Sequence, residues 1–431
     1  MKISRFTNII KKDGIYLLHN TLVNSVVRIN AESRQKFIDT IESGKSFSLD
    51  PNDNFHLTLQ ALNMIVDESE DEVASLNSQF FMFEHSSELH IMLIVTRRCN
   101  FRCAYCYEKY IDSDMRPDIF EKTKKYILCQ IERNKYKNIY ISFFGGEPTL
   151  MAREINLFME QLLNENNKLP YPANIKAVIT TNGYLLTPKL IDEFIKNHIV
   201  RYQITVDGLE DDHNSSRYLT DGTGTWKTII KNLSYFNQIQ DPSVSVLLRS
   251  NITPQLYSHV DDWLKFIHDN FSGPRFRIHF EAAKDFGHMN DKNFALISNE
   301  VDVIEEIIDK SKKWKLPLEL VGFRTKPFSM ICYAARQSSY IIDYNGEIKK
   351  CTSTSLDEPY NCIGSISETG IKVNWKKAAQ WTSYKLHPRC ESCIILPLCY
   401  QRKCPFAKNS FENCALLKRS YIKGLEYFYL P

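Results

Sequence analysis

The chain has 431 residues, of which 43% are hydrophobic and 24% are charged, an ordinary composition for a globular protein. Its 54 Lys and Arg against 51 Asp and Glu give a net charge of +3, which argues against a dominant nucleic-acid-binding or membrane-binding surface. No apolar run approaches the ~18 residues of a membrane helix, and the N-terminus lacks the apolar core and cleavage site of a secretory signal. We therefore expect a cytoplasmic protein whose twelve cysteines are reduced thiols or metal ligands rather than disulfides.

Residues 1–88 are expected to form a separate small α+β domain, winged-helix-like in its order of elements. Two short strands are predicted at 15–18 and 26–29, and helical periodicity runs from 56 to 64. The acidic run 67–72 is interpreted as a solvated face or linker. A hairpin followed by helices in under ~90 residues is a plausible module for binding a peptide or a partner.

Residues 89–320 show a regular alternation of strands and helices. Strands are predicted at 90–95, 139–144, 175–180, 202–206, 244–249 and 276–280. Helices are predicted at 118–133, 154–164, 188–197, 226–236, 255–270 and 300–313. Six strands alternating with helices predict an α/β fold, a partial (β/α)6 barrel whose loops meet at one mouth.

A loop with three cysteines directly follows the first of these strands: Cys99, Cys103 and Cys106. Three thiolates suit a cubane iron–sulfur cluster, which takes four ligands, and they leave one iron open to a group that is not protein. Structural zinc is the rival interpretation, but it needs four closed ligands and no His lies in the loop.

Polar residues and glycines follow the next strands at the same edge of the predicted sheet. Any one of them alone could simply form a turn, but their gathering at one edge favours a ligand site for amino, carboxylate and ribose groups. The residues are Gly145, Gly146, Glu147, Pro148, Asn182, Thr205, Asp207, Arg217, Arg249 and Asn251.

Residues 321–431 form a third predicted domain, irregular and rich in cysteine. A hairpin with an Asn345-Gly346 turn is expected to bring Cys351 back towards Cys332. The other cysteines of this region are Cys362, Cys390, Cys393, Cys399, Cys404 and Cys414. On spacing alone a zinc ribbon at Cys390, Cys393 and later cysteines stays open beside iron–sulfur clusters.

The spacing Cys99-x3-Cys103-x2-Cys106, with an aromatic residue before the last cysteine, resembles the signature of the radical S-adenosylmethionine (SAM) enzymes. The stretch 145–148, Gly-Gly-Glu-Pro, resembles their motif for the SAM amino group. The cysteines from Cys332 to Cys414 resemble the SPASM extension, which carries two auxiliary four-iron clusters. The resemblance spans about residues 89–414 and implies a cluster that binds SAM and generates a 5′-deoxyadenosyl radical.

The same resemblance implies roles for individual residues. Cys99, Cys103 and Cys106 would hold the first cluster. Gly146 and Glu147 would contact the methionine amine of SAM. The ribose or carboxylate of SAM would be contacted by Thr205, Asp207, Arg217 and Asn182. One auxiliary cluster would take Cys390, Cys393, Cys399 and Cys414. The other would take Cys332, Cys351 and Cys404, with three clusters in all.

Two departures from the family pattern concern that last cluster. Four residues separate Cys399 from Cys404, where the family usually has three, and no cysteine lies between Cys332 and Cys351. Either Cys362 supplies the fourth ligand or that iron stays open to substrate.

SPASM proteins mostly modify peptides or protein side chains, which leaves two functions. The first is a maturase that uses the radical to form an intrapeptide crosslink, a thioether or a carbon-based bond. Its substrate would be a ribosomally made precursor peptide with a leader, and its electron donor would be a flavodoxin or ferredoxin. The second is an anaerobic sulfatase-maturating enzyme that makes formylglycine from Cys or Ser. Those enzymes usually lack about ninety residues before their cysteine loop and tend to carry an Asp where this chain has Thr352. A non-catalytic iron–sulfur scaffold is disfavoured by the SAM motifs.

Overall fold

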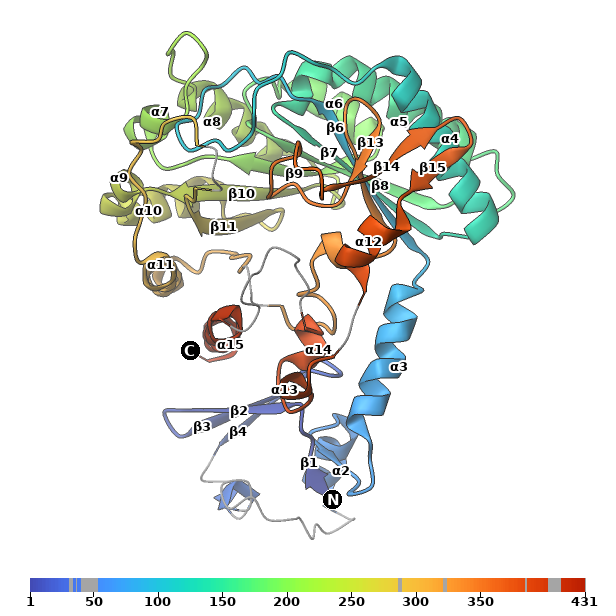
Figure 1. Ribbon diagram of the computed structural model, residues 1–431. Coiled ribbons are helices and arrows are strands. Elements are labelled where there is room, and N and C mark those ends of the chain that lie inside the picture. Colours follow the sequence, from blue (N-terminus) through green and yellow to red (C-terminus); the bar gives the residue numbers. More distant parts are fainter. Residues whose placement is uncertain are drawn as a thin grey trace. The chain divides into compact units, whose positions relative to one another are not determined.

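The computed structural model describes residues 1–30, 34, 35, 37–39, 53–285, 289–320, 324–383, 386–401 and 412–430 (Figure 1). The chain divides into two compact units, each described by itself. Unit 1 comprises residues 1–86, 320–337 and 381–431, and unit 2 comprises residues 87–319 and 338–380. Cys404 lies outside the described residues.

Unit 2 is built on a ten-stranded sheet, six strands of which are parallel and adjacent in chain order. These strands are β6 (Glu88–Thr96), β7 (Asn138–Gly145), β8 (Asn174–Thr181), β9 (Ile199–Thr205), β10 (Ser245–Ile252) and β11 (Phe276–Ala282). The helices between and after them include α4 (Pro117–Asn134), α5 (Ala152–Asn166), α6 (Pro188–Lys196), α8 (Trp226–Tyr235), α10 (Val260–Phe271) and α11 (Glu300–Trp314). All six predicted strands are confirmed, and the parallel order gives the predicted α/β partial barrel.

The apolar pattern of each strand explains its place in the sheet. In β7, Ile139, Ile141 and Phe143 are fully buried, whereas Tyr140 and Ser142 between them are only partly buried. This period of two is what a pleated strand requires to keep one face in the core. Each fully buried side chain of this size stabilises the fold by about 1.5–3 kcal/mol relative to an exposed one.

Within the strand–helix alternation predicted for residues 89–320, two helices differ from the sequence-based expectation. The predicted helix 255–270 is interrupted, because α9 (Pro254–Ser258) ends at Ser258 and α10 begins only at Val260, with His259 between them outside both helices. The short helix α7 (Glu210–Ser216) was not predicted, since its seven residues carry no apolar periodicity. Both lie near the ends of β9 and β10, where the site described below is assembled.

The sheet continues beyond β6 into the C-terminal part of the chain. β12 (Ser339–Ile342) pairs parallel with β6, and β13 (Glu347–Lys349) returns antiparallel, which confirms the predicted hairpin. β14 (Cys362–Ser367) and β15 (Gly370–Val373) complete the sheet and are followed by α12 (Trp375–Thr382). The sheet of unit 2 therefore includes a stretch of the cysteine-rich region.

Unit 1 is organised around a three-stranded antiparallel meander of β2 (Thr7–Lys12), β3 (Ile15–Asn20) and β4 (Ser25–Asn30). One face of the meander packs Tyr16, Leu18 and Ile29 with α2 (Asn54–Ala61), and the other packs Leu17 with α15 (Glu412–Tyr429). The remaining elements are β1 (Lys2–Ile3), β5 (Ile65–Val66), α3 (Glu72–Glu84), α13 (Pro388–Glu391) and α14 (Leu396–Cys399). The first and last segments of the chain thus share one core.

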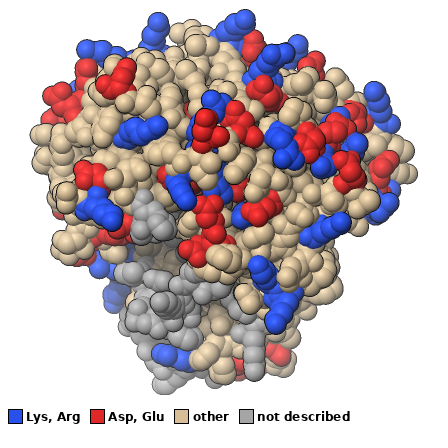
Figure 2. Space-filling model, turned by 45° about the horizontal axis from the view of Figure 1, so that its top comes forward, with Lys and Arg blue, Asp and Glu red and all other residues tan. Residues whose placement is uncertain are grey.

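The surface carries both signs of charge close together. Figure 2 shows Lys and Arg side chains interspersed with Asp and Glu on the visible face, as expected from the small net charge of +3. Among the described helices, none combines the length and apolar character that crossing a bilayer requires.

Candidate functional site

Backbone hydrogen bonds connect the cysteine loop that follows β6 to two other segments of the chain. On one side Arg102 N donates to Tyr218 O (2.9 Å) and Ala104 N donates to Ser216 O (2.9 Å), at the end of α7. On the other side Asp291 N donates to Ala104 O (3.0 Å). The loop therefore has a fixed backbone conformation at the C-terminal end of the parallel strands, where α/β folds place their ligands.

The three thiols of this loop lie close enough to influence one another. Burial raises the pKa of Cys99, Cys103 and Cys106, that of Cys106 to about 12, and the neighbouring thiol charges raise the pKa of Cys99 and Cys106 further. Thiolates are the ligands that iron binds, so an electropositive group is needed to hold all three in the ionised form. The donor set fits an iron–sulfur cluster in this respect. Within the described ranges, no three His, Cys, Asp or Glu side chains converge where a single metal ion could be held.

The Gly-Gly-Glu-Pro stretch lies directly against the backbone that leads into the cysteine loop. Gly146 N donates to Thr96 O (3.0 Å) and Glu147 N donates to Arg98 O (2.9 Å). A Cβ on Gly145 would lie 2.1 Å from Thr96 O, and one on Gly146 would lie 2.3 Å from Arg98 O. Only glycine allows this contact, so both glycines are required for the two loops to pack together.

Glu147 is fully buried and holds the ends of two strands together. Its Oε1 accepts hydrogen bonds from Thr149 N (3.0 Å), Thr149 Oγ1 (2.6 Å) and Thr181 Oγ1 (2.7 Å), and its Oε2 accepts one from Asn182 N (2.7 Å). Burial raises the pKa of Glu147, and these hydrogen bonds act in the opposite direction. Asn182 Nδ2 in turn donates to Asn100 Oδ1 (2.8 Å) in the cysteine loop. The carboxylate thus links β7, β8 and, through Asn182, the cysteine loop.

A second network is centred on the hydroxyl of Tyr105, the aromatic residue of the cysteine motif. The hydroxyl donates to Asp207 Oδ2, and it accepts hydrogen bonds from Arg217 Nη1 (2.7 Å) and Asn251 Nδ2 (3.0 Å). Asn251 N also donates to Asp207 Oδ1 (2.7 Å). The network joins the cysteine loop to residues beyond β9, after α7 and at the end of β10, and it includes the predicted site residues Asp207 and Arg217.

Arg217 carries a buried donor that this network does not use. Its side chain is buried, and its Nε–H has no hydrogen-bond partner among the described residues. A buried unpaired donor is costly unless a ligand satisfies it. Asp207 lies 3.9 Å from Arg217 Nη1, and Cys103 contributes to the electrostatic field at the guanidinium. The orphaned donor therefore fits an anionic or hydroxyl group of a ligand beside the cysteine loop.

Two carboxyl groups in the same unit have pKa values on opposite sides of their ordinary range. Burial raises the pKa of Glu108, two residues after Cys106, to about 7. Burial would also raise the pKa of Glu281, but His279 and Lys284 overcome this effect and lower it to about 2. Lys284 Nζ lies 2.7 Å from Glu281 Oε1. Glu281 therefore stays ionised, whereas Glu108 can gain or lose a proton near neutral pH.

Arg97 forms an ion cluster that sequence reasoning missed. Its guanidinium donates to both carboxylate oxygens of Asp343, after β12, and to Asp357 Oδ1 (2.6 Å). Arg97 and Asp343 are both buried. Because 246 residues separate the two, no local pattern signals their pairing. The cluster connects the segment before Cys99 with the loop that follows Cys351.

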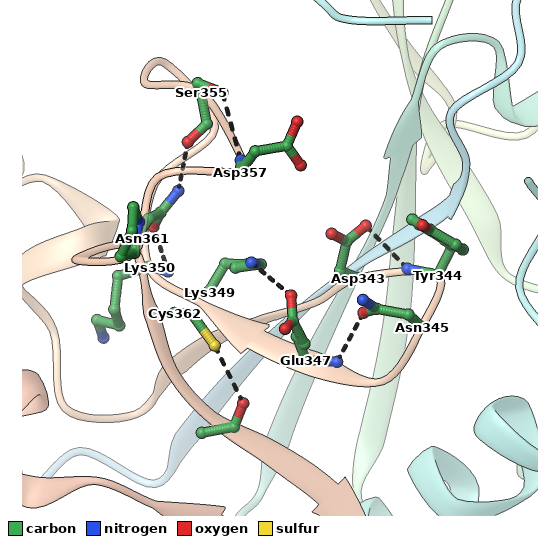
Figure 3. Close-up of polar contacts among 12 residues, drawn as sticks. Asp343, Tyr344, Asn345, Glu347, Lys349, Lys350, Ser355, Asp357, Asn361 and Cys362 are labelled. Carbon is green, nitrogen blue, oxygen red and sulfur yellow. Dashed lines mark hydrogen bonds and ion pairs between the residues drawn. The ribbon is translucent and has the colours of Figure 1, made fainter. Parts of the chain in front are cut away.

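That loop is held by the fully buried side chain of Asn361 (Figure 3). Asn361 Oδ1 accepts from Lys350 N and Cys351 N (3.0 Å each), and its Nδ2 donates to Cys351 O (2.8 Å) and Ser355 O (3.4 Å). Cys362 follows directly at the start of β14, and its Sγ lies 3.6 Å from Gly364 O. Two predicted ligands, Cys351 and Cys362, are thus placed on one ordered segment of unit 2.

A second group of cysteines lies in unit 1. Burial raises the pKa of Cys390, and the charges of Cys393 and Cys414 raise it further, so these three thiols are near one another. Cys393 and Cys399 both pack against the core shared by Leu398 and Tyr421. The structure therefore gathers the four cysteines predicted for one auxiliary cluster in the same unit, while Cys332 lies in unit 1 and Cys351 in unit 2.

The remaining predicted SAM contacts occupy the expected edge. Pro148 is the first residue of a buried 3-10 turn, and Thr205 is the last residue of β9, opposite Arg249 of β10. The missed residues are of two kinds. Tyr105 had a signal, its position in the cysteine motif, whereas the roles of Asn100, Glu108 and Asn361 had none; Asn251 was already among the predicted strand-end residues.

Comparison with known proteins identifies one matching family and several relatives of part of the chain. Residues 93–267 match the Radical SAM superfamily. A stretch of 163 residues, 34% of this chain, is 32% identical to the radical SAM cyclopropyl synthase TigE of Paramaledivibacter caminithermalis and spans 32% of that protein. A stretch of 135 residues is 33% identical to a GTP 3′,8-cyclase of Campylobacter jejuni and spans 38% of it. The chain thus matches about a third of the length of each of these relatives.

Two solved structures share the fold over most of the chain. The structure of anSMEcpe with bound AdoMet and the Cp18Cys peptide has a TM-score of 0.57 and 20% identity, and the match covers 79% of this chain and 96% of that one. Streptococcus suis SuiB bound to its precursor peptide SuiA has a TM-score of 0.50 and 16% identity, with 92% and 94% covered. At these identities the likeness establishes the fold.

Proposed function

Because residues 93–267 match the Radical SAM superfamily, we propose that this chain is a radical SAM enzyme that modifies a ribosomally made precursor peptide and forms an intrapeptide crosslink, a thioether or a carbon-based bond. The observation that carries the proposal is the orphaned Nε–H of Arg217, in the Tyr105 network beside the three cysteines. This arrangement provides a place for a cluster and for a polar ligand against it.

The bound cluster and SAM would supply one capability, abstraction of a hydrogen atom by a 5′-deoxyadenosyl radical. Cys99, Cys103 and Cys106 would hold the cluster. Arg217 would donate its free Nε–H to the carboxylate or ribose of SAM, with its guanidinium fixed by Tyr105 and Asp207.

Two further residues would shape the amine end of this site. Gly146 and Glu147 are proposed to meet the methionine amine, and the buried Glu147 carboxylate holds that loop against β8 through Thr181 and Asn182. Thr205 and Asn182 are proposed as secondary SAM contacts. Pre-positioning of this kind reduces the reorganisation that binding would otherwise require.

Unit 1 supports the choice of a peptide substrate. Among the described strands of its meander, β2 and β4 are the outer ones, and an outer strand is where an extended leader segment can add to a sheet. The fold is also shared with SuiB and anSMEcpe, whose structures contain peptides. We propose that the leader binds here, and that the chain carries three [4Fe–4S] clusters.

The auxiliary clusters are assigned as proposals in the same way. One takes Cys390, Cys393, Cys399 and Cys414, and the other takes Cys332, Cys351 and Cys404, with Cys362 or an open position as fourth ligand. The sulfatase-maturating alternative predicts an Asp at residue 352, where this chain has a buried Thr.

Anaerobic reconstitution with a small Cys-containing peptide encoded beside the gene tests the proposal. We expect mass spectrometry to find loss of two hydrogens per event, and iron analysis to find about twelve irons per chain, four per cubane. The triple variant C99A/C103A/C106A is the matched control and should be inactive while keeping its auxiliary iron. A Cys converted to an aldehyde would establish the sulfatase alternative instead, and zinc at the C-terminal cysteines would contradict the three-cluster assignment.

A further inference from the structure

One exposed surface of unit 2 combines an aromatic side chain with several positive charges. Trp375, at the start of α12, is 73% exposed, and Lys372, Asn374 and Lys376 beside it in the chain are also exposed. Residues 370–380 contain three Lys and no Asp or Glu. We call these four side chains the β15–α12 patch.

The patch lies next to the segment that carries two candidate cluster ligands. β15 is the outermost strand of the ten-stranded sheet (Figure 1), and it pairs with β14, which begins at Cys362. Asn374 N donates to Ile363 O (2.7 Å), the residue after Cys362. Asn361, on the other side of Cys362, holds Cys351. A partner seated on the patch is therefore close to the strand and loop that present Cys351 and Cys362.

Neighbouring charges leave the patch positive. Glu368, in the β14–β15 turn, is 3.5 Å from Lys122 Nζ and 3.6 Å from Lys125 Nζ, so α4 balances its charge. Lys377 Nζ donates to the Pro359 carbonyl (2.9 Å) and anchors the start of α12 to the loop after Cys351. The exposed Lys372 and Lys376 are thus available to an acidic partner.

We propose that the β15–α12 patch is the docking surface for a small acidic electron-donor protein of the flavodoxin or ferredoxin type. The inference rests on the proposed function, which needs one electron from outside the chain for each SAM cleaved. The donor's reduced centre loses that electron and the enzyme gains it, with no bond formed or broken. A small exposed patch with one Trp suits such a partner, because electron-transfer contacts are often smaller than ~1,200 Å² and Trp is a frequent interface anchor. Lysines around it would steer an acidic protein and orient it on the surface.

The test compares two ways of supplying the electron to the reconstituted holoenzyme. An acidic flavodoxin, chemically reduced, must dock, whereas dithionite is a small ion that needs no docking surface. The test variants are W375A and K372E/K376E. The matched controls are Y171A, an aromatic residue that is also 73% exposed, and K189E/K231E, two exposed lysines on α6 and α8. The readouts are 5′-deoxyadenosine formation and the Kd of oxidised flavodoxin for the holoenzyme.

Docking at the patch predicts that both test variants raise the Kd for flavodoxin at least tenfold and slow flavodoxin-driven 5′-deoxyadenosine formation. In the charge-reversed variant, the Kd should lose most of its dependence on salt concentration. Dithionite-driven formation and both controls should match wild type. Unchanged flavodoxin affinity in W375A and K372E/K376E would overturn the docking inference, as would an equal loss with dithionite. Failure of wild-type enzyme to cleave SAM with dithionite would contradict the proposed function, and the Kd comparison would still decide the docking site.

Discussion

Arg97 and Asp343 form a buried, two-point ion pair between the end of β6 and the end of β12. Arg97 stands two residues before Cys99, and Asp343 stands at the turn of the hairpin that leads to Cys351. The pair therefore joins the two cysteine-bearing segments of unit 2 through neighbouring parallel strands. Asp357 adds a third member from the loop after Cys351.

Substitution R97L should destabilise unit 2 strongly. Removal of the guanidinium leaves the Asp343 carboxylate buried without its cation, which typically costs about 3–5 kcal/mol. Denaturant unfolding of the anaerobic protein measures the change. The neighbouring R98L is the matched control, because Arg98 pairs with Asp114 at a half-exposed position and should cost no more than about 1 kcal/mol. Equal effects in the two variants would show that the Arg97 cluster has no special structural role.

Substitution G146A should disrupt the contact between the Gly-Gly-Glu-Pro loop and the cysteine loop. The added Cβ would meet a backbone oxygen, Arg98 O, at 2.3 Å, so the two loops must separate. We expect SAM affinity to fall at least tenfold, measured by anaerobic equilibrium dialysis. The control is G273A, where an added Cβ meets nothing within 4 Å. Wild-type SAM affinity in G146A would contradict the packing argument.

Substitution R217K should weaken SAM binding while keeping the positive charge. Lysine carries its three donors on one nitrogen and has no counterpart of the buried Nε–H, so it cannot reproduce the two-point geometry of Arg217. A loss of about 1.4 kcal/mol, or tenfold in Kd, is the minimum expected for one lost hydrogen bond to a charged group. R201K, at an exposed position on β9, should bind SAM normally. Equal SAM affinity in R217K and wild type would remove Arg217 from the ligand site.

His19 should make unit 1 sensitive to acid. Burial lowers the pKa of His19 to about 4, so the unfolded chain takes up a proton at higher pH than the folded one does. The free energy of unfolding is therefore highest above pH ~6.5, where His19 is neutral in both states. It falls by about 3 kcal/mol as the pH drops to 4.

The measurement is the free energy of unfolding at pH 7 and pH 4 for wild type and H19Q. The variant should lose less stability than wild type between these pH values, because glutamine does not titrate. H85Q, at the exposed residue directly after α3, is the control and should behave as wild type. A pH dependence in H19Q identical to that of wild type would exclude His19 as the source.

The parallel strands and the site edge were predictable because their signals are local. Long apolar runs with polar residues at their ends identify β6 to β10 and the residues that follow each of them. α7 was not predictable, since its polar sequence becomes helical only where Ser216 O and the residues after it bind the cysteine loop. The Arg97–Asp343 pair and the union of α15 with the β2–β4 meander depend on contacts between distant parts of the chain, for which one sequence carries no pattern.

The most direct test of the central claim follows the abstracted hydrogen itself. The holoenzyme is incubated anaerobically with dithionite, SAM and the neighbouring precursor peptide, synthesised with deuterium on its side-chain and α-carbons. If the chain is a radical SAM peptide maturase, deuterium from the peptide will appear in 5′-deoxyadenosine. The crosslinked peptide will form in the same yield as the deuterated 5′-deoxyadenosine. Formation of 5′-deoxyadenosine without deuterium, with the peptide mass unchanged, would contradict the assignment of a peptide substrate.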